Sequence, residues 1–126
     1  MSSLQSKVAD LLQVAKYAPS GGNLQPWKVY MIADEETLQS KRIKLIVAID
    51  EQMEIGQYAD LGAFIQNIRL LCPEHQLAVA SPIRFFDVDS HGMDATTQPY
   101  RELFNIPRHE LIFCEMELKQ APHSKL

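Results

Sequence analysis

Apolar residues near the start of the chain recur at the spacing of a helix. The positions that follow a period of about 3.6 residues are Leu4, Val8, Leu11, Leu12 and Ala15. Pro19 interrupts the pattern, because a proline cannot continue a helix. The pattern predicts an amphipathic helix over residues 3–18.

Two later segments are short and nearly continuous in apolar character, as buried strands are. The segment "WKVYMIA" predicts a buried strand over residues 27–33. The segment "RIKLIVAID", residues 42–50, is rich in β-branched residues and predicts a strand at the centre of a sheet. Between the two strands, "DEETLQSK" predicts one or two helical turns with acidic residues at the favourable end.

A second long helix is predicted over residues 58–72, with Pro73 just past its end. Its apolar face is broad and comprises Leu61, Phe64, Ile65, Ile68, Leu71 and Cys72. One side of a small sheet should not need so wide a face, so we expect the helix to lie at the centre of a homodimer. Gln66 and Asn67 are either interface polar groups or part of a solvated helix face.

The second half of the chain predicts two strands and a short helix. "PIRFFDVD" (82–89) predicts a strand, and "YRELFNI" (100–106) predicts a short helix that is closed by Pro107. "ELIFCEMEL" (110–118) alternates between apolar and polar positions, which is typical of a strand. This alternation puts Ile112, Cys114, Met116 and Leu118 on one face and Glu115 and Glu117 on the other. The order of these elements predicts an α+β or α/β sandwich with few strands.

Composition narrows the class of protein further. The 126 residues fit one domain, and the net charge of −4 without a long run of one sign argues against nucleic-acid binding. The sequence has neither an apolar run of about 20 residues nor a signal peptide, so we expect a cytoplasmic protein that does not enter membranes. Cys72 and Cys114 are expected to be free buried thiols, which suits a reducing compartment. The four histidines lack the spacing of metal ligands, so no metal site is expected.

The segment "PSGGNLQPW", residues 19–27, carries more chemistry than a plain helix-to-strand connection needs. Gly21 and Gly22 would let a flat ligand approach the backbone closely. The hydrogen-bonding side chains of Ser20, Asn23 and Gln25 suit the polar edge of a planar heterocycle. The alternative interpretation is that this loop only ends a helix and starts a strand.

"YAPSGGNLQPW" resembles the signature of the nitroreductase family of FMN-dependent dimeric flavoproteins. Three later segments are similar to the family in the same order, namely "RIKLIVAID", "YADLGAFIQNIRLLCPEHQL" and "YRELFNIPRHELIFCEMEL". The resemblance covers most of the chain. It implies a single nitroreductase-like domain over residues 1–126, an α+β sandwich whose mainly antiparallel sheet is flanked by helices, and a homodimer.

The resemblance also implies a cofactor and an activity. Ser20, Gly21 and Asn23 would contact FMN from the subunit opposite the one that holds most of the cofactor, and Gln25 would lie near the flavin edge. NAD(P)H would reduce the flavin, and a nitro compound, a quinone or a similar electron-poor molecule would then be reduced. No catalytic side chain is expected, because the cofactor carries the hydride transfer.

The sequence departs from the family in ways that leave a second hypothesis open. Family members usually have an arginine-rich stretch that grips the FMN phosphate, and this sequence starts after that point. It also resembles a shortened member, since only "DEETLQSK" stands where the family usually has a helical insertion. The basic residues that could replace the missing arginines are Lys28, Lys41, Arg42 and Arg84. The chain is therefore either an FMN-dependent oxidoreductase or a degenerate dimer that has lost FMN and acts as a binding or structural protein.

Overall fold

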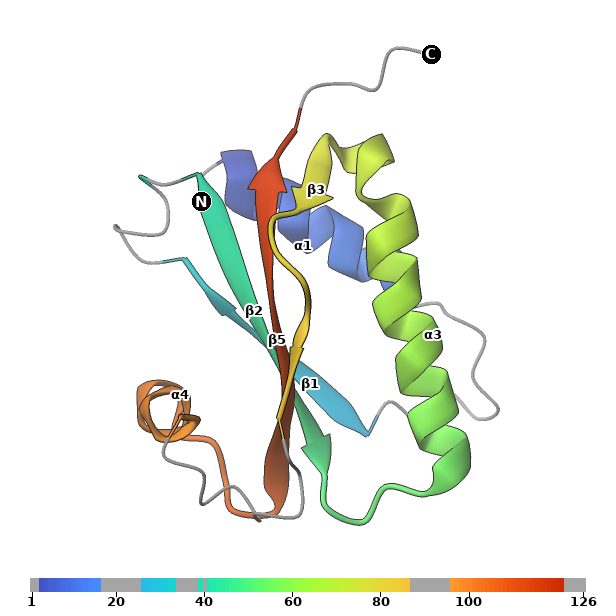
Figure 1. Cartoon of the computed structure of the whole chain (residues 1–126), viewed down its shortest axis with the longest axis vertical. Coiled ribbons are helices and arrows are strands. Elements are labelled where there is room, and N and C mark those ends of the chain that lie inside the picture. Colours follow the sequence, from blue (N-terminus) through green and yellow to red (C-terminus); the bar gives the residue numbers. More distant parts are fainter. Residues whose placement is uncertain (1–2, 17–25, 34–38, 40, 87–95, 122–126) are drawn as a thin grey trace.

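The computed structural model describes residues 3–16, 26–33, 39, 41–86 and 96–121. Along the chain, its elements are α1 (Ser3–Ala15), β1 (Trp27–Ile32), β2 (Arg42–Asp50), α3 (Ile55–Leu71), η1 (Pro73–His75), β3 (Leu77–Val79), β4 (Arg84–Phe85), α4 (Gln98–Phe104) and β5 (Glu110–Gln120). The strands form one sheet in the order β1-β2-β5-β3, and β4 also pairs with β5. Every pairing is antiparallel, so the predicted α+β fold with a mainly antiparallel sheet is confirmed (Figure 1).

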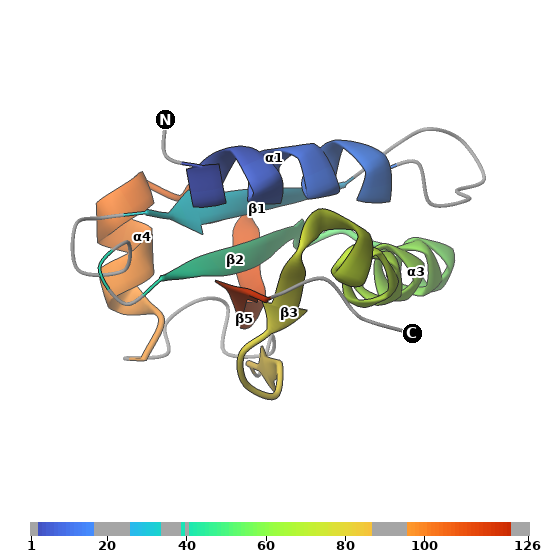
Figure 2. The same ribbon diagram turned by 90° about the horizontal axis from the view of Figure 1, so that it is seen from above.

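Helices lie on both sides of the sheet. Figures 1 and 2 show α3 and α4 on opposite sides of the strands, with α1 packed beside α3. The side under α1 and α3 carries the larger hydrophobic cluster, which we call the main core. It includes Leu11 from α1, Leu45 from β2, Ile68 from α3 and Met116 from β5. The side under α4 carries the minor core, which consists of Ile32, Ile46, Ile106 and Ile112 with Tyr30, Phe86, Tyr100 and Phe104 packed around them.

The predicted central strand is confirmed. The strand β2 lies between β1 and β5, and its residues from Leu45 to Ile49 are all buried. The prediction for residues 27–33 needs a correction, because β1 is an edge strand of the described sheet and Lys28 within it is exposed. An edge strand has one pairing neighbour and tolerates such a charge.

The predicted alternation in β5 is wrong at Ile112. Val47 pairs with Cys114, but the next residue, Ala48, pairs with Ile112, so Phe113 is an extra residue that forms a β-bulge. The bulge turns Ile112 into the minor core, while Leu111 joins Cys114, Met116 and Leu118 in the main core. Alternation of residue types cannot reveal this shift, because Leu111, Ile112 and Phe113 are all apolar.

Other element boundaries also differ from those predicted. The helix α1 ends at Ala15 in place of residue 18, and α3 begins at Ile55 in place of residue 58. Glu54, the residue just before α3, fixes the start of this helix. Its backbone N–H donates to Gln57 Oε1 at 2.9 Å. The three-residue strand β3 was not predicted, and of the strand expected over 82–89 only Arg84–Phe85 is a strand within the described residues. Most of "DEETLQSK" lies outside the described residues.

Candidate functional site

The predicted flavin-contacting residues Ser20, Gly21, Asn23 and Gln25 lie outside the described residues, so their role stays a prediction. Both flanks of this segment are described. On one side α1 ends at the buried Ala15, and on the other side Pro26 leads into β1. The start of β1 is therefore the described part of the chain that adjoins the end of the loop.

Trp27, the only tryptophan in the chain, belongs to the main core. Its side chain is tilted against the Phe64 ring of α3 with the two centroids 5.5 Å apart, and the residue is 8% exposed. Beside it, the carbonyl of Pro26 accepts a hydrogen bond from the Asp50 amide at 2.9 Å. The start of β1 is therefore anchored both by packing and by the backbone, which makes the exit from the loop rigid.

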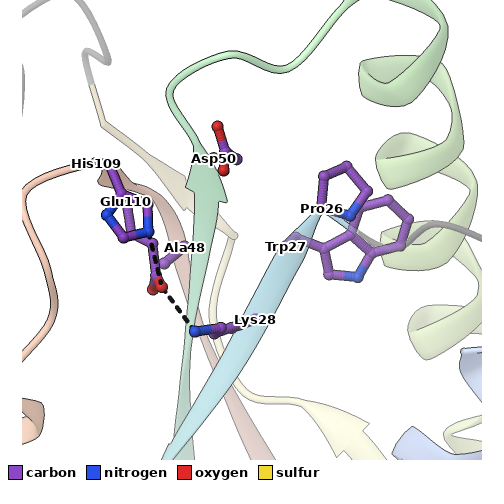
Figure 3. Close-up of a pocket in the computed structure, with 7 residues that line it drawn as sticks. All are labelled: Pro26, Trp27, Lys28, Ala48, Asp50, His109 and Glu110. Carbon is purple, nitrogen blue, oxygen red and sulfur yellow. Dashed lines mark hydrogen bonds and ion pairs between the residues drawn. The ribbon is translucent and has the colours of Figure 1, made fainter.

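A cavity of about 130 Å³ opens at this end of the sheet (Figure 3). Figure 3 shows the apolar side chains of Pro26 and Trp27 together on one side of it, and His109 and Glu110 on the other with Ala48 beside them; Lys28 and Asp50 complete the lining. Pockets for drug-sized ligands and cofactors are about 300–1,000 Å³. This cavity by itself does not fit a flavin.

Glu110, the first residue of β5, is the best-connected charged group of the cavity. Its Oε2 accepts from Lys28 Nζ at 2.8 Å, and its Oε1 accepts from the Tyr30 hydroxyl at 2.7 Å. His109 Nε2 lies 4.0 Å from Oε2. Burial opposes ionisation of Glu110, but the hydrogen bonds from Lys28 and Tyr30 and the charges of Lys28 and His109 outweigh it, so the Glu110 pKa is lowered.

Tyr30 is held in its neutral form by the same contact. Burial, together with the hydrogen bond to Glu110 and the charge of that carboxylate, raises the pKa of Tyr30 to about 12. At neutral pH Glu110 is therefore an anion and Tyr30 a phenol. Neither group has the pKa near 7 that a general acid or base needs, so this pair is suited to holding structure and charge in place.

A second polar group borders the minor core farther along the sheet. The Tyr100 hydroxyl of α4 donates to Glu115 Oε2 at 2.5 Å, and Lys44 Nζ lies 3.3 Å from the Tyr100 oxygen. Burial raises the pKa of Tyr100, and the contact with Glu115 raises it further. Arg84 forms a looser ion pair with Glu115 at 3.8 Å. These residues attach α4 and β4 to the sheet.

The four basic residues considered as replacements for the phosphate-binding arginines lie in different places. Lys28 adjoins the cavity and is paired with Glu110. Arg42 begins β2 at the opposite end of the strand and pairs with Glu117 at 3.3 Å, with Lys41 next to it in the chain. Arg84 lies on β4. Of these residues, Lys28 alone lies beside the exit of the predicted loop.

The thiols and histidines contribute no reactive centre among the described residues. Cys72 and Cys114 are free and buried, as predicted. Burial raises the pKa of both thiols, that of Cys114 to about 12, which disfavours the reactive thiolate. In the described part of the chain, no group of histidine, cysteine and acidic residues has the geometry of a metal site. No helix in these residues combines the length and the apolar character needed to cross a bilayer.

Comparison with solved structures identifies the class of fold. An FMN and NADPH-dependent nitroreductase from Sphigopyxis sp. strain HMH matches with a TM-score of 0.69 at 16% identity, covering 97% of this chain and 85% of that one. A nitroreductase with bound FMN from Desulfitobacterium hafniense DCB-2 matches with a TM-score of 0.68 at 16% identity, covering 95% and 79%. A nitroreductase-like family protein from Bacillus cereus gives 0.65 at 19% identity, covering 97% and 79%. The chain has the nitroreductase fold.

The sequence comparison agrees over the first part of the chain. The model of the nitroreductase family matches residues 5–52, a range that includes the predicted loop and both β1 and β2. No curated protein matches the sequence. The predicted resemblance to the nitroreductase family is confirmed, with a family-model match over residues 5–52 and a fold match over nearly the whole chain.

Sequence reasoning missed the contact between Lys28 and Glu110. The two residues are 82 positions apart, and each was an ordinary charged residue in its own segment. The only signal was that Lys28 and Tyr30 occupy the same, more polar side of β1, which meant that this side needed a polar partner. The sequence did not show that the partner comes from the first residue of β5.

Proposed function

We propose that the chain is an FMN-dependent NAD(P)H oxidoreductase of the nitroreductase type, which reduces nitro compounds, quinones or similar electron-poor molecules. The observation that carries the proposal is the family match over residues 5–52, because this range contains the loop predicted to contact the flavin. The fold match to proteins named as FMN-dependent nitroreductases supports it.

In this proposal Ser20, Gly21, Asn23 and Gln25 contact the flavin ring from the loop that precedes Pro26. Bound FMN would supply the hydride transfer, so the protein needs no nucleophile or general acid. The described residues support the binding role. Pro26 and Trp27 hold the exit of the loop rigidly, through the Asp50 amide and the Phe64 ring.

We also propose a cytoplasmic location, because both cysteines are free thiols.

We further propose a homodimer with α3 near its axis. The broad apolar face of α3, from which the dimer was predicted, packs inside the main core of the chain itself. Leu61, Phe64, Ile65 and Ile68 are buried within the chain itself, so they are not available to a partner. A partner would meet the outward side of α3, where Ile55 is 89% and Leu70 64% exposed. Such paired, self-complementary surfaces are typical of twofold dimers.

The dimer is tested by one substitution and a matched control. Leu70→Glu should convert a dimer into a monomer, because it puts a charge on the proposed interface. Leu103→Glu changes a leucine of α4 that is equally exposed, 63% against 64%, and should leave the mass unchanged. Light scattering at micromolar concentration measures both. A monomeric wild type, or equal behaviour of the two variants, would rule out this interface.

The cofactor and the activity are tested on the purified full chain. We expect flavin absorbance, or quenching of FMN fluorescence with a dissociation constant below about 50 µM, which corresponds to roughly −6 kcal/mol. NADH or NADPH should then be consumed when a nitro compound or a quinone is added. Gly21→Val should weaken FMN binding by placing a side chain where the ligand approaches. Leu103→Glu is its control, because Leu103 is an exposed residue of α4, on the opposite side of the strands from α3 and the proposed interface.

The second hypothesis, a degenerate dimer without FMN, makes the opposite prediction. It is favoured by two observations at the start of β1. The cavity there holds only about 130 Å³, and Lys28 is already paired with a carboxylate. If wild type does not bind FMN at tens of micromolar (roughly −6 kcal/mol), this hypothesis replaces the first.

A further inference from the structure

Glu110 contacts a strand that is not its neighbour. It begins β5, whereas Lys28 and Tyr30 lie on β1, and β2 runs between the two strands. The carboxylate therefore spans the width of β2 to accept hydrogen bonds of 2.8 and 2.7 Å. Backbone pairing alone would give β1 no direct link to β5.

The contact is possible because the residue beneath it is small. Ala48 of β2 pairs with Lys28 on one side and with Ile112 on the other, and it lines the cavity. Figure 3 shows Ala48 close to Glu110, with the carboxylate directed toward Lys28. A larger side chain at position 48 would occupy the space over which Glu110 and Lys28 meet.

Glu110 is itself firmly held. Its side chain is 6% exposed against 65% for Lys28, so the carboxylate is the fixed partner and the lysine is the adaptable one. Its backbone carbonyl accepts from Arg101 Nη2 of α4 at 2.6 Å. A fixed carboxylate with two donors from one edge strand can determine where that strand lies.

We propose that Glu110 is a positioning residue: through Lys28 and Tyr30 it fixes the first residues of β1 across β2, and so sets the position of Pro26 and Trp27 beside the cavity. Trp27 is the first residue of the edge strand, opposite Ile49, and one backbone hydrogen bond, from the Asp50 amide to the Pro26 carbonyl, lies beyond it. Strand ends with one neighbour are the easiest to displace. The link to flavin binding rests on the proposed function, in which the binding loop ends at Pro26.

The test compares Glu110→Gln with Glu117→Gln. Both glutamates lie on β5 and accept from basic residues, but Glu117 pairs with Arg42 and Lys44 at the far end of the sheet. Trp27 is the only tryptophan, so its fluorescence reports directly on the start of β1. We expect Glu110→Gln to shift the emission to the red, to raise quenching by acrylamide at least twofold and to raise the dissociation constant for FMN about tenfold. Glu117→Gln should leave all three unchanged.

Two smaller changes keep the test decisive if Glu110→Gln does not fold. Lys28→Met and Tyr30→Phe each remove one donor, and each should give part of the change in emission and in FMN affinity. Lys28→Arg keeps the ion pair and should restore wild-type values. Folded Glu110→Gln or Lys28→Met variants with wild-type Trp27 emission would overturn the proposal.

The two proposals can fail separately. If wild type does not bind FMN, the proposed function fails, while the Trp27 emission and quenching still decide whether Glu110 positions β1. If wild type binds FMN and the variants shift the emission without changing the affinity, Glu110 positions the strand but not the binding site, and the inferred link is wrong.

Discussion

The two faces of the sheet are built on different principles. On the face under α1 and α3, apolar residues from both helices and the central strands pack into one continuous cluster. On the face under α4, which we call the polar face, four isoleucines form a small patch, and hydrogen-bonded pairs such as Tyr30 with Glu110 and Tyr100 with Glu115 border it. The main core stabilises the fold by burying apolar surface. The polar face instead holds individual side chains at defined hydrogen-bonding distances.

The largest expected effect is a cavity in the main core. Leu45→Ala should lower the free energy of unfolding by about 3–5 kcal/mol, because Leu45 is fully buried in the main core and its truncation leaves a cavity there. Ile46→Ala, the next residue on the opposite face, should cost nearer 2 kcal/mol because the minor core is smaller. Denaturant unfolding measures both. Equal costs would mean that the two cores contribute alike.

The polar face should respond to the loss of a single hydroxyl. Tyr30→Phe removes the donor to Glu110 and should cost about 1.5 kcal/mol, the usual range for a hydrogen bond to a charged group. Urea unfolding at pH 7 gives the number. A cost below about 0.3 kcal/mol would show that the bond to Lys28 alone satisfies the carboxylate.

Acid should act on the polar face before it acts on the main core. The folded pKa of Glu110 is lowered, so its contribution is fully present above the unfolded pKa of about 4.5 and is lost as the pH falls through the folded value. Protonation removes the attraction of the carboxylate to the charges around it, which come from Lys28, His109 and Arg101. Unfolding measured from pH 6 down to pH 3 should show this loss. In Glu110→Gln this part of the slope should disappear.

At alkaline pH the two faces should behave alike. The raised pKa values of Tyr30 and Cys114, both about 12, mean that their contributions are complete below the unfolded pKa and are lost as the pH rises toward 12. Tyr30 lies on the polar face and Cys114 in the main core. The tyrosinate absorbance of Tyr30, taken as the difference between wild type and Tyr30→Phe, and the thiolate absorbance of Cys114, taken as the difference between wild type and Cys114→Ala, should therefore rise together at the pH of global unfolding. Ionisation of Tyr30 near pH 10 in the folded state would contradict this.

The smallest effect is expected at the exposed end of the polar face. Arg42→Met removes an ion pair with Glu117 in which the side chains of both residues remain open to solvent, so its cost should be below about 0.5 kcal/mol and should fall further in salt. Lys28→Met is the comparison, because it leaves the carboxylate of Glu110 buried with one donor fewer. The lysine change should cost more. If it does not, Glu110 is less dependent on its ion pair than its burial implies.

Much of the fold followed from patterns in the sequence. β-branched residues in "RIKLIVAID" identified the central strand, and helical spacing from Leu61 to Ile68 identified α3. These signals are strong because they repeat over many residues. The bulge at Phe113 and the short strand β3 leave no such pattern, since one extra residue or three paired residues change no periodicity.

The candidate site was less accessible to sequence reasoning. The chemistry of the loop around Ser20 and Asn23 predicted a ligand site from the residue types, and this prediction stays untested. The link between Lys28 and Glu110 depends on a contact over 82 positions and on the small size of Ala48 between them. Such contacts are set by the register of three strands, and register is decided only when the sheet assembles.

The place of β5 in the chain has a consequence for synthesis. This strand pairs with β2, β3 and β4, yet the ribosome makes it after all of them. Until residues 110–120 emerge, β1 and β2 are a two-stranded hairpin, which is marginally stable in water. The backbone edge of β2 that later pairs with β5 is meanwhile open to any extended chain nearby. The nascent protein is thus most exposed to misassembly during the interval between the release of β2 and the arrival of Glu110.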